Sequence, residues 1–267
     1  MIPILKGNIG KVTILLLILF TSTFLVPILP FQDPLRISLD ERLSPPSLQH
    51  PFGTDELGRD VFSRVLYGFA TTIRVSIFAL LSSLVIGVIL GGVAGYLYGT
   101  WVDNTFNWVI SFIFSLPFLL IMVSIMSLMK PDIFNAYIIL TLIMWVNPAR
   151  IVRAEVIRTK DLDYVTALKA FGASEIHTLS RAILPVCVQS AVIFSVSYLP
   201  EIIGLEAGLS FLGLGVQPPY PGLGKMIFDG LNYIYSAPWI ALFPAAALFL
   251  LVLFINVILR FYGKQND

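Results

Sequence analysis

The stretch DYVTALKAFGASEIHTLSRAILP, Asp163 to Pro185, is polar and has helical periodicity on both sides of a single glycine. It lies in the middle of a chain in which 57% of the residues are hydrophobic and only 12% are charged. Long uncharged runs flank it, which is the pattern of a protein that crosses the membrane several times. We therefore expect this stretch to be a two-helix element outside the bilayer.

The uncharged runs are long enough to serve as transmembrane helices, because roughly 20 residues of α-helix cross a bilayer core about 30 Å thick. Six runs fit: Val12–Leu29, Val75–Tyr98, Phe106–Met129, Ile133–Ala149, Ala182–Pro200 and Leu231–Leu259. We expect the fourth to continue as a helix through the region of Arg150, and the sixth to begin near Pro238 and Pro244. The sequence predicts an all-α integral membrane protein with six transmembrane helices.

The first run follows Lys6 and Lys11, as the apolar part of a secretory signal peptide would. It is longer than that part usually is, and no small-residue cleavage site follows it. We expect an uncleaved span.

Basic residues predict the orientation. Six spans put both termini on one side, and a cytoplasmic location places ten of the seventeen Lys and Arg residues inside. The segment 150–181 is then cytoplasmic, while Phe31–Arg74 and the Gly- and Pro-rich loop Leu205–Gly230 are external. The predicted topology is N-in and C-in.

Several functions are excluded by charge and by the rare side chains. A net charge of +1 leaves no basic surplus for binding nucleic acid. His50 and His177 fall in opposite soluble segments, and the single cysteine, Cys187, lies in an apolar run. We therefore predict no catalytic residues and no metal site. The phosphate-binding pattern G-x-x-x-x-G-K-[ST] does not occur, so ATP would have to be hydrolysed on another chain.

The central element carries the signals of two short helices. Asp163 is expected to cap a helix that starts at Tyr164, and Gly172 to end it in the left-handed conformation. Ser174 is expected to cap a second helix, with Thr178 facing solvent. The apolar faces would consist of Tyr164, Ala167, Leu168 and Phe171 in the first helix and Ile176, Leu179 and Ile183 in the second.

Two uses of this element compete. It could lie on lipid headgroups, aided by Lys169 and Arg181. It could also be a rigid peg whose apolar face enters a groove on a soluble partner. A fixed glycine hinge helps a peg and gives nothing to a lipid-lying helix, so the pattern favours docking.

The same stretch resembles the EAA loop of binding-protein-dependent ABC importer permeases, which reads E-A-A-x-x-x-G and, nine residues later, x-L-P. Thr166-Ala167-Leu168 stands in place of Glu-Ala-Ala, Gly172 is the glycine, and Leu184-Pro185 closes the motif. The missing Glu and second Ala are departures from the pattern. HPFGTDELGRDVFSRVLYG (50–68) and EAGLSFLGLGVQPPYPGLGKMI (206–227) resemble segments of the dipeptide, oligopeptide and nickel branch.

This resemblance implies the type I ABC importer permease fold and a bacterial or archaeal cytoplasmic (inner) membrane location. It implies three parts: residues 1–70 with the first span and an external segment, residues 71–260 as the transmembrane domain with a coupling element at 160–184, and a tail at 261–267. The implied partners are a paralogous second permease, two ATP-binding subunits that hold ATP and magnesium, and an extracytoplasmic substrate-binding protein. The chain itself would be no enzyme and would bind no cofactor.

The resemblance also implies which residues meet the ATPase. They are Tyr164, Thr166, Ala167, Leu168, Lys169, Phe171, Gly172, Ala173, Ser174, Ile176 and Leu179. ATP-driven closure of the ATPases would pull on this element and rock the spans between inward-open and outward-open states.

The translocation pathway has weaker signals. Glu201 is the acid nearest a span interior and could face a peptide amine or a cationic chelate, or could lie at the interface without a specific role. Met122, Met126 and Met129 share one face of the third run, as a soft-metal track or, more commonly, as packing residues.

The cargo stays open between peptides, nickel and metal chelates. A secondary, ion-coupled transporter is the alternative function. It would normally place ionisable residues near the midplane of several helices, and this chain offers few.

Overall fold

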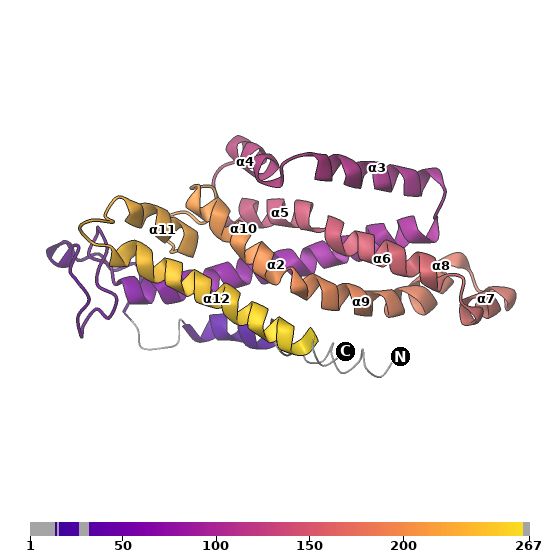
Figure 1. Ribbon diagram of the computed structural model, residues 1–267, viewed down its shortest axis with the longest axis horizontal. Coiled ribbons are helices and arrows are strands. Elements are labelled where there is room, and N and C mark those ends of the chain that lie inside the picture. The colour runs from indigo at the N-terminus through magenta and orange to yellow at the C-terminus, as the bar shows by residue number, and fades with distance from the viewer. Residues whose placement is uncertain (1–13, 15, 27–31, 264–267) are drawn as a thin grey trace. The chain divides into compact units, whose positions relative to one another are not determined.

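The computed structural model describes residues 14, 16–26 and 32–263. Within these residues the extended pairing is limited to an isolated bridge between Thr54 and Asp60, so the prediction of an all-α fold is confirmed. The elements labelled in Figure 1 and those between them are η2 (Leu39–Glu41), α2 (Val61–Tyr96), α3 (Trp101–Ser115), α4 (Phe118–Leu128), α5 (Ile133–Met144), α6 (Val146–Thr159), α7 (Asp163–Ala170), α8 (Glu175–His177), the π-helix η3 (Thr178–Ile183), α9 (Leu184–Ser197), α10 (Leu199–Phe211), α11 (Leu223–Leu231) and α12 (Trp239–Gly263).

Some predictions fall outside the described residues. They concern Lys6 and Lys11, both ends of the first predicted span, and residues 264–267 of the predicted tail. The described chain divides into two compact units. One holds residues 79–121 and 141–198, and the other holds the described residues of 14–78, 122–140 and 199–267. The division at residues 70 and 260 inferred from the resemblance stays a prediction.

In the first unit, α6 packs beside α9 (Figure 1). Helix α2 approaches α6 through glycines spaced four residues apart. A Cβ atom at Gly91 would lie 2.2 Å from the carbonyl oxygen of Ala149, and one at Gly95 would lie 2.7 Å from that of Arg153. Glycine at these positions lets the two backbones approach closely, as small residues do between membrane helices.

An ion pair fastens α3 to α6 in the same unit. Arg153 donates from Nε and Nη2 to the two carboxylate oxygens of Asp103, at 2.6 and 3.0 Å. Asp103 is buried and also accepts a hydrogen bond from the Asn107 amide. This two-point pairing gives the buried Asp103 carboxylate a partner of opposite charge.

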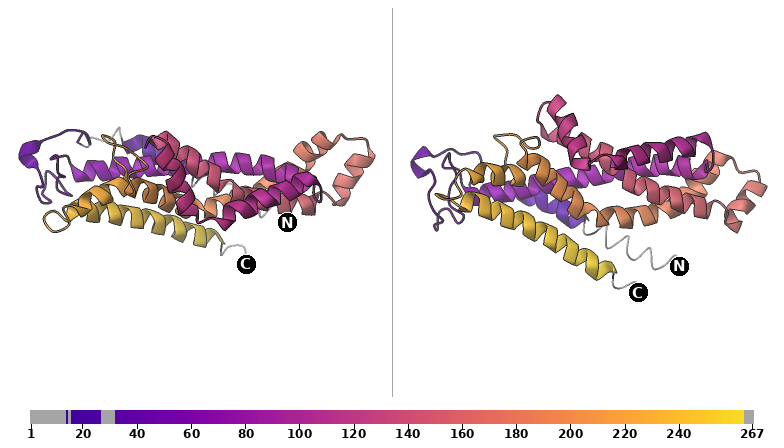
Figure 2. Two further views of the ribbon diagram at one scale, coloured as in Figure 1. Left: turned by 90° about the horizontal axis from the view of Figure 1, so that it is seen from above. Right: turned by 45° about the horizontal axis from the view of Figure 1, so that its top comes forward.

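In the second unit, α11 packs against both α10 and α12, and the three lie together in both views of Figure 2. Gly224 allows the first contact, since a Cβ there would lie 2.0 Å from the carbonyl oxygen of Ala207. The apolar core of this unit joins α2, α10 and α12 with the short apolar helix Leu16–Leu25. Its buried residues are Leu19, Ile73, Ile77, Leu199, Ile203, Leu251 and Ile255.

Four helices of the described chain are long and apolar enough to span a membrane: Val61–Tyr96, Ile133–Thr159, Glu175–Ser197 and Trp239–Arg260. Helices α3 and α4 make a fifth only if they are counted as one broken span. Large apolar side chains such as Phe249 and Phe254 on α12 are exposed, as lipid-facing residues would be. The membrane fold class is confirmed, whereas six spans and the N-in, C-in topology stay predictions.

Two predicted boundaries are confirmed, and the start of the second span is corrected. The fourth run does continue through Arg150 as helix, to Thr159, and the last helix does begin beside Pro238, at Trp239. The second helix was predicted to start at Val75 but starts at Val61. Its charged first turns are helical because Arg64 is paired with Asp55, as described below.

The third predicted span is two helices in the structure. Helix α3 ends at Ser115, Leu116 is extended with φ −102° and ψ 140°, and α4 starts at Phe118. Pro117 explains the break, because proline disfavours the helical conformation of the residue before it.

The predicted fifth span and the loop after it also differ from the structure. The helix that Ser174 was expected to cap and the predicted span from Ala182 form one continuous helix, Glu175–Ser197, and α10 carries helix on to Phe211. The loop predicted at 205–230 is therefore helical at both ends, with irregular chain only between Phe211 and Leu223.

Candidate coupling site

The central element is anchored to its unit by an apolar cluster. Val165 of α7 is fully buried with Val152 and Val156 of α6, and with Ile183 and Cys187. Sequence reasoning missed Val165, because its predicted face followed Tyr164 instead. Cys187, which lies in an apolar run of the sequence, is buried.

Polar contacts add to this anchor. The Tyr164 hydroxyl donates to the carbonyl oxygen of Ala182 over 3.3 Å, which joins α7 to η3. The Lys169 ammonium lies 5.2 Å from the ring centre of Tyr96 on α2. Burial of apolar surface and these contacts hold the two-helix element as one body with α6 and α9.

Gly172 ends α7 in the left-handed conformation, with φ +84°, as predicted. The amide of Ala173 donates to the carbonyl oxygen of Leu168 over 3.1 Å, and the amide of Gly172 donates to that of Lys169 over 3.0 Å. This pair of bonds is the Schellman motif, which satisfies the carbonyl groups at a helix end. The turn therefore has one defined geometry.

Ser174 caps the second helix, as predicted: its Oγ accepts a hydrogen bond from the amide of His177 over 3.3 Å. The prediction for the first helix was wrong. Asp163 lies inside α7, in the first turn, and the cap position is Leu162 with no side-chain bond. The carboxylate still favours the helix, because negative charge is stabilised near the N-terminus of a helix dipole.

Thr178 was predicted to face solvent, and this was wrong too. It is fully buried, and its hydroxyl donates to the carbonyl oxygen of Ser174 over 3.0 Å. Thr178 begins the π-helix, which ends at Ile183, two residues before Pro185 in the first turn of α9. Because proline has no N–H and crowds the preceding turn, a wider turn accommodates it, and this shifts the helical phase that the sequence pattern assumed.

The tip of the element carries two large exposed apolar side chains. Phe171 is 91% exposed and Ile176 is 82% exposed, on either side of the Gly172 turn. In Figures 1 and 2 the hairpin of α7 and α8 extends beyond the ends of α6 and α9. A rigid turn thus presents apolar surface away from its own unit.

The predicted contact residues divide by burial. Three of them are half-buried: Leu168, Ala173 and Leu179. The others are exposed: Tyr164, Thr166, Ala167, Lys169, Phe171, Gly172, Ser174 and Ile176. Leu179 packs against the apolar cluster. A role in docking for each residue stays a prediction.

The residues predicted to line the translocation pathway differ in burial. Glu201 is exposed, whereas Met122 and Met126 are buried and Met129 is half-buried. Burial favours the packing alternative for the methionines. No group of three or more His, Cys, Asp or Glu residues is arranged to hold a metal in the part of the chain that the structure describes.

Glu206 is a buried acid that sequence reasoning did not single out. It is 1% exposed and accepts hydrogen bonds from the hydroxyls of Thr72, over 2.7 Å, and Ser210, over 2.9 Å. Ser210 follows at the i+4 spacing of a helix, so the signal was present. The assignment of this segment to a loop concealed it.

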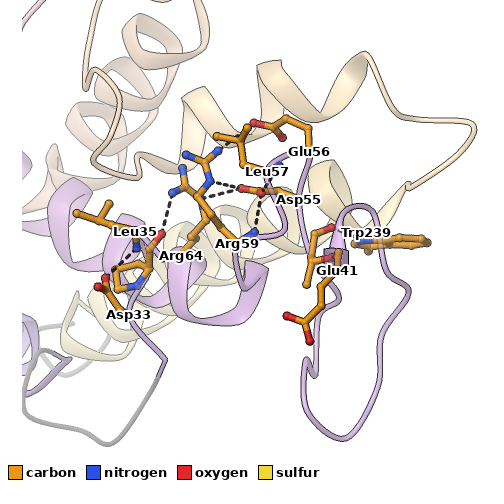
Figure 3. A network of polar contacts seen from close by, with 11 residues as sticks. Asp33, Leu35, Glu41, Asp55, Glu56, Leu57, Arg59, Arg64 and Trp239 are labelled. Atoms are coloured by element: carbon orange, nitrogen blue, oxygen red, sulfur yellow. Dashed lines mark hydrogen bonds and ion pairs between the residues drawn. The ribbon is translucent and has the colours of Figure 1, made fainter. Parts of the chain in front are cut away.

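The motif HPFGTDELGRD folds into a polar network around Asp55 (Figure 3). The Asp55 carboxylate is contacted by Arg59 Nε at 2.7 Å and Arg64 Nε at 3.3 Å, and all three side chains are buried. Arg64 also donates to the carbonyl oxygen of Pro34 over 3.0 Å. The network folds the segment before α2 back onto that helix.

Further bonds fasten this segment to both neighbouring helices. Asp60 caps α2 by accepting a bond from the amide of Ser63 over 2.7 Å, and it contacts His50 Nδ1 at 2.9 Å. Trp239, at the start of α12, donates to the carbonyl oxygen of Thr54 over 3.0 Å. Gly53 lies so close to Trp239 that no larger residue fits.

Comparison with known proteins agrees with this architecture. The family described as "Binding-protein-dependent transport system inner membrane component" matches residues 83–265, which include the whole coupling element. The dipeptide transport system permease protein DppC of Bacillus subtilis is 40% identical over 245 residues, covering 91% of this chain and 76% of that protein. The glutathione transport system permease protein GsiD of Pectobacterium atrosepticum is 34% identical, covering 92% of this chain and 82% of its own.

Two solved structures share the fold. An amino acid ABC transporter with histidines aligns with a TM-score of 0.57 and 14% identity, over 76% of this chain and 94% of its own. The methionine ABC transporter MetNI, in an inward-facing conformation, aligns with a TM-score of 0.56 and 17% identity, over 75% and 95%. The expected type I permease fold and inner-membrane location agree with these matches. The chain belongs to the family of binding-protein-dependent transport system inner membrane components, the permease subunits of ABC importers.

Proposed function

We propose that this chain forms half of the translocation pathway of an ATP-driven importer of short peptides. Its relatives are named for the transport of dipeptides, oligopeptides and glutathione. These names favour peptides over nickel or metal chelates as the cargo. Membership of this family also favours an ATP-driven importer over the ion-coupled transporter, which the sequence had left as an alternative.

The proposed assembly contains the components that a binding-protein-dependent ABC importer requires. A substrate-binding protein delivers the peptide from outside, and a paralogous permease completes the pathway. Two cytoplasmic subunits bind ATP and magnesium and hydrolyse the nucleotide, because this chain has no phosphate-binding loop of its own.

The observation that carries the coupling role is the exposed apolar tip formed by Phe171 and Ile176. Burying a large apolar side chain contributes about 1.5–3 kcal/mol, so the two together give a groove on an ATPase substantial affinity. The Gly172 turn fixes how the tip is aimed. The buried cluster at Val165 transmits a pull on the tip to α6 and α9.

Uptake measurements test the proposed function. The complete importer in proteoliposomes, with its binding protein, should take up radiolabelled Ala-Phe when ATP is enclosed with the ATPases. A protonophore should leave uptake intact, and a non-hydrolysable ATP analogue should stop it. Uptake that follows the proton gradient and ignores ATP would contradict the proposal.

A further inference from the structure

We propose that a cavity in the second unit binds a short peptide through its free amino and carboxyl groups. The cavity has a volume of about 430 Å³, within the usual range for small-molecule sites. Its lining comes from α2, from the start of α5 and from the loop after α10: Thr71, Arg74, Asp132, Ile133, Val216, Gln217, Pro218 and Tyr220. This inference rests on the proposed function and names where the peptide is held.

Arg74 is a cation without a carboxylate partner among the residues that the structure describes. Its Nη2 donates to the carbonyl oxygen of Thr23 over 2.6 Å, and its guanidinium carbon lies 5.4 Å from the ring centre of Phe24. Its Nε is buried and has no hydrogen-bond partner among the described residues, where it also forms no ion pair. The positive charge of Arg74 is therefore not balanced by a carboxylate of the described chain, and an anion bound in the cavity that Arg74 lines would balance it.

Asp132 supplies the opposite charge on the same cavity. One carboxylate oxygen accepts a bond from the amide of Phe134 over 2.7 Å, which fixes the side chain at the start of α5. The residue is exposed, and within the described chain it forms no ion pair, with Arg74 or with any other cation. A cavity with one unpaired cation and one unpaired anion is complementary to a zwitterion.

Gln217 adds a positioned acceptor. Its amide nitrogen donates to the carbonyl oxygens of Gly213 and Gly215, both over 3.0 Å. The side chain is thereby held in place, and its amide oxygen is left to accept a hydrogen bond from an ammonium or peptide N–H group.

A second cavity adjoins the first and is apolar. Its volume is about 390 Å³, and it shares Arg74 and Ile133 with the charged cavity. The rest of its lining is Val75, Phe78, Phe134 and Tyr137. The pair of cavities thus fits charged termini in one and an apolar or aromatic side chain in the other, as in Ala-Phe.

Arg74 and the loop after α10, which line the charged cavity, belong to segments predicted to be external. A site there would receive the peptide from the binding protein before it enters the pathway. An ethanolamine lipid headgroup is also zwitterionic, so the test has to separate a peptide from a lipid.

The test measures equilibrium binding of radiolabelled Ala-Phe to the assembled importer without its binding protein. The importer is held in nanodiscs of phosphatidylcholine and phosphatidylglycerol. We expect Arg74→Gln and Asp132→Asn each to weaken binding by about tenfold or more, because each removes a charge-assisted contact. Arg74→Gln should erase the preference for Ala-Phe over its C-terminal amide, and Asp132→Asn the preference over N-acetyl-Ala-Phe.

Two variants make the result specific. Arg74→Lys keeps the charge and should keep the preference for a free carboxylate, which separates recognition from a general loss of structure. Lys130→Gln removes an exposed cation that does not line the cavity, and it should bind like wild type.

Wild-type binding of Ala-Phe by Arg74→Gln and Asp132→Asn would overturn the site, as would absence of binding to the wild-type complex. If uptake driven by the binding protein persists in either case, the proposed function stands without the site. Loss of Ala-Phe binding when phosphatidylethanolamine is added would assign the cavity to lipid and overturn the peptide site. Failure of the complete importer to take up any peptide would overturn the proposed function itself.

Discussion

The coupling element and the segment before α2 meet the same requirement in opposite ways. Both hold an irregular chain rigid beyond the end of a helix. The segment before α2 encloses its own polar groups, with Asp55 buried between Arg59 and Arg64. The coupling element buries Val165 but leaves Phe171 and Ile176 exposed. The first region is satisfied within the chain, whereas the second leaves apolar surface exposed, which we propose an ATPase subunit covers.

Asp55→Ala should have the largest effect and should act on stability. It leaves the buried guanidinium of Arg64 without a carboxylate and that of Arg59 with Glu56 alone, and breaking a buried pair in this way costs about 3–5 kcal/mol. The apparent unfolding temperature of the purified complex should fall, while any folded fraction should keep its ATPase docking. Asp40→Ala, at an exposed acid in η2, is the control and should change neither. Equal stability of the two variants would contradict the account of this network.

Phe171→Ala should act in the opposite manner, on docking alone. Loss of about 1.5–3 kcal/mol of apolar burial corresponds to roughly 10- to 100-fold weaker binding of the ATPase. Thermal stability of the isolated chain should be unchanged, because the side chain contacts solvent there. Phe194→Ala, at an exposed phenylalanine of α9, should leave ATPase affinity as it is.

Ala167→Arg separates docking from lipid contact. Ala167 is exposed on α7, so an arginine fits the free chain. It should nevertheless abolish uptake, because it forces a large charged group into the interface. A helix that lay on anionic headgroups would tolerate or gain from the added charge. Normal uptake at normal expression would therefore favour the lipid-lying alternative.

Gly172→Val should cost about 1–2 kcal/mol, because the left-handed backbone disfavours a β-branched side chain. Straightening the turn to escape this strain would re-aim Ile176, so substrate-stimulated ATP hydrolysis should fall. Gly172→Asn should retain more activity, since asparagine tolerates this conformation. Gly99 has φ +81° and open space around it, as Gly172 has. Gly99→Val therefore imposes the same strain elsewhere and should leave coupling intact.

Thr178→Ala should have the smallest effect, about 1 kcal/mol of stability, through loss of its buried hydrogen bond to Ser174. Ser180→Ala, at an exposed serine two residues away, is the neutral control. Thermal unfolding of the two variants side by side measures the difference.

Local signals in the sequence predicted much of the coupling element. Left-handed glycine and a serine cap depend on neighbouring residues only, so Gly172 and Ser174 could be predicted. Burial depends on which face meets α6 and α9, and this is why Val165 and Thr178 were misjudged. The charged residues before Val75 also led to a wrong predicted start for the second span. The charge of Arg64 is balanced by Asp55, nine residues earlier in the chain.

The most direct test of the central claim is labelling of Ile176→Cys with an impermeant maleimide, in a background where Cys187 is replaced. Ile176 is 82% exposed in the chain alone, so an introduced thiol there is accessible. We predict labelling from the cytoplasmic side of the two-permease complex, none from the outside, and strong protection once the ATPases are bound. Labelling that is equal with and without the ATPases, or that occurs from outside, would contradict the claim that this tip docks on the ATPase.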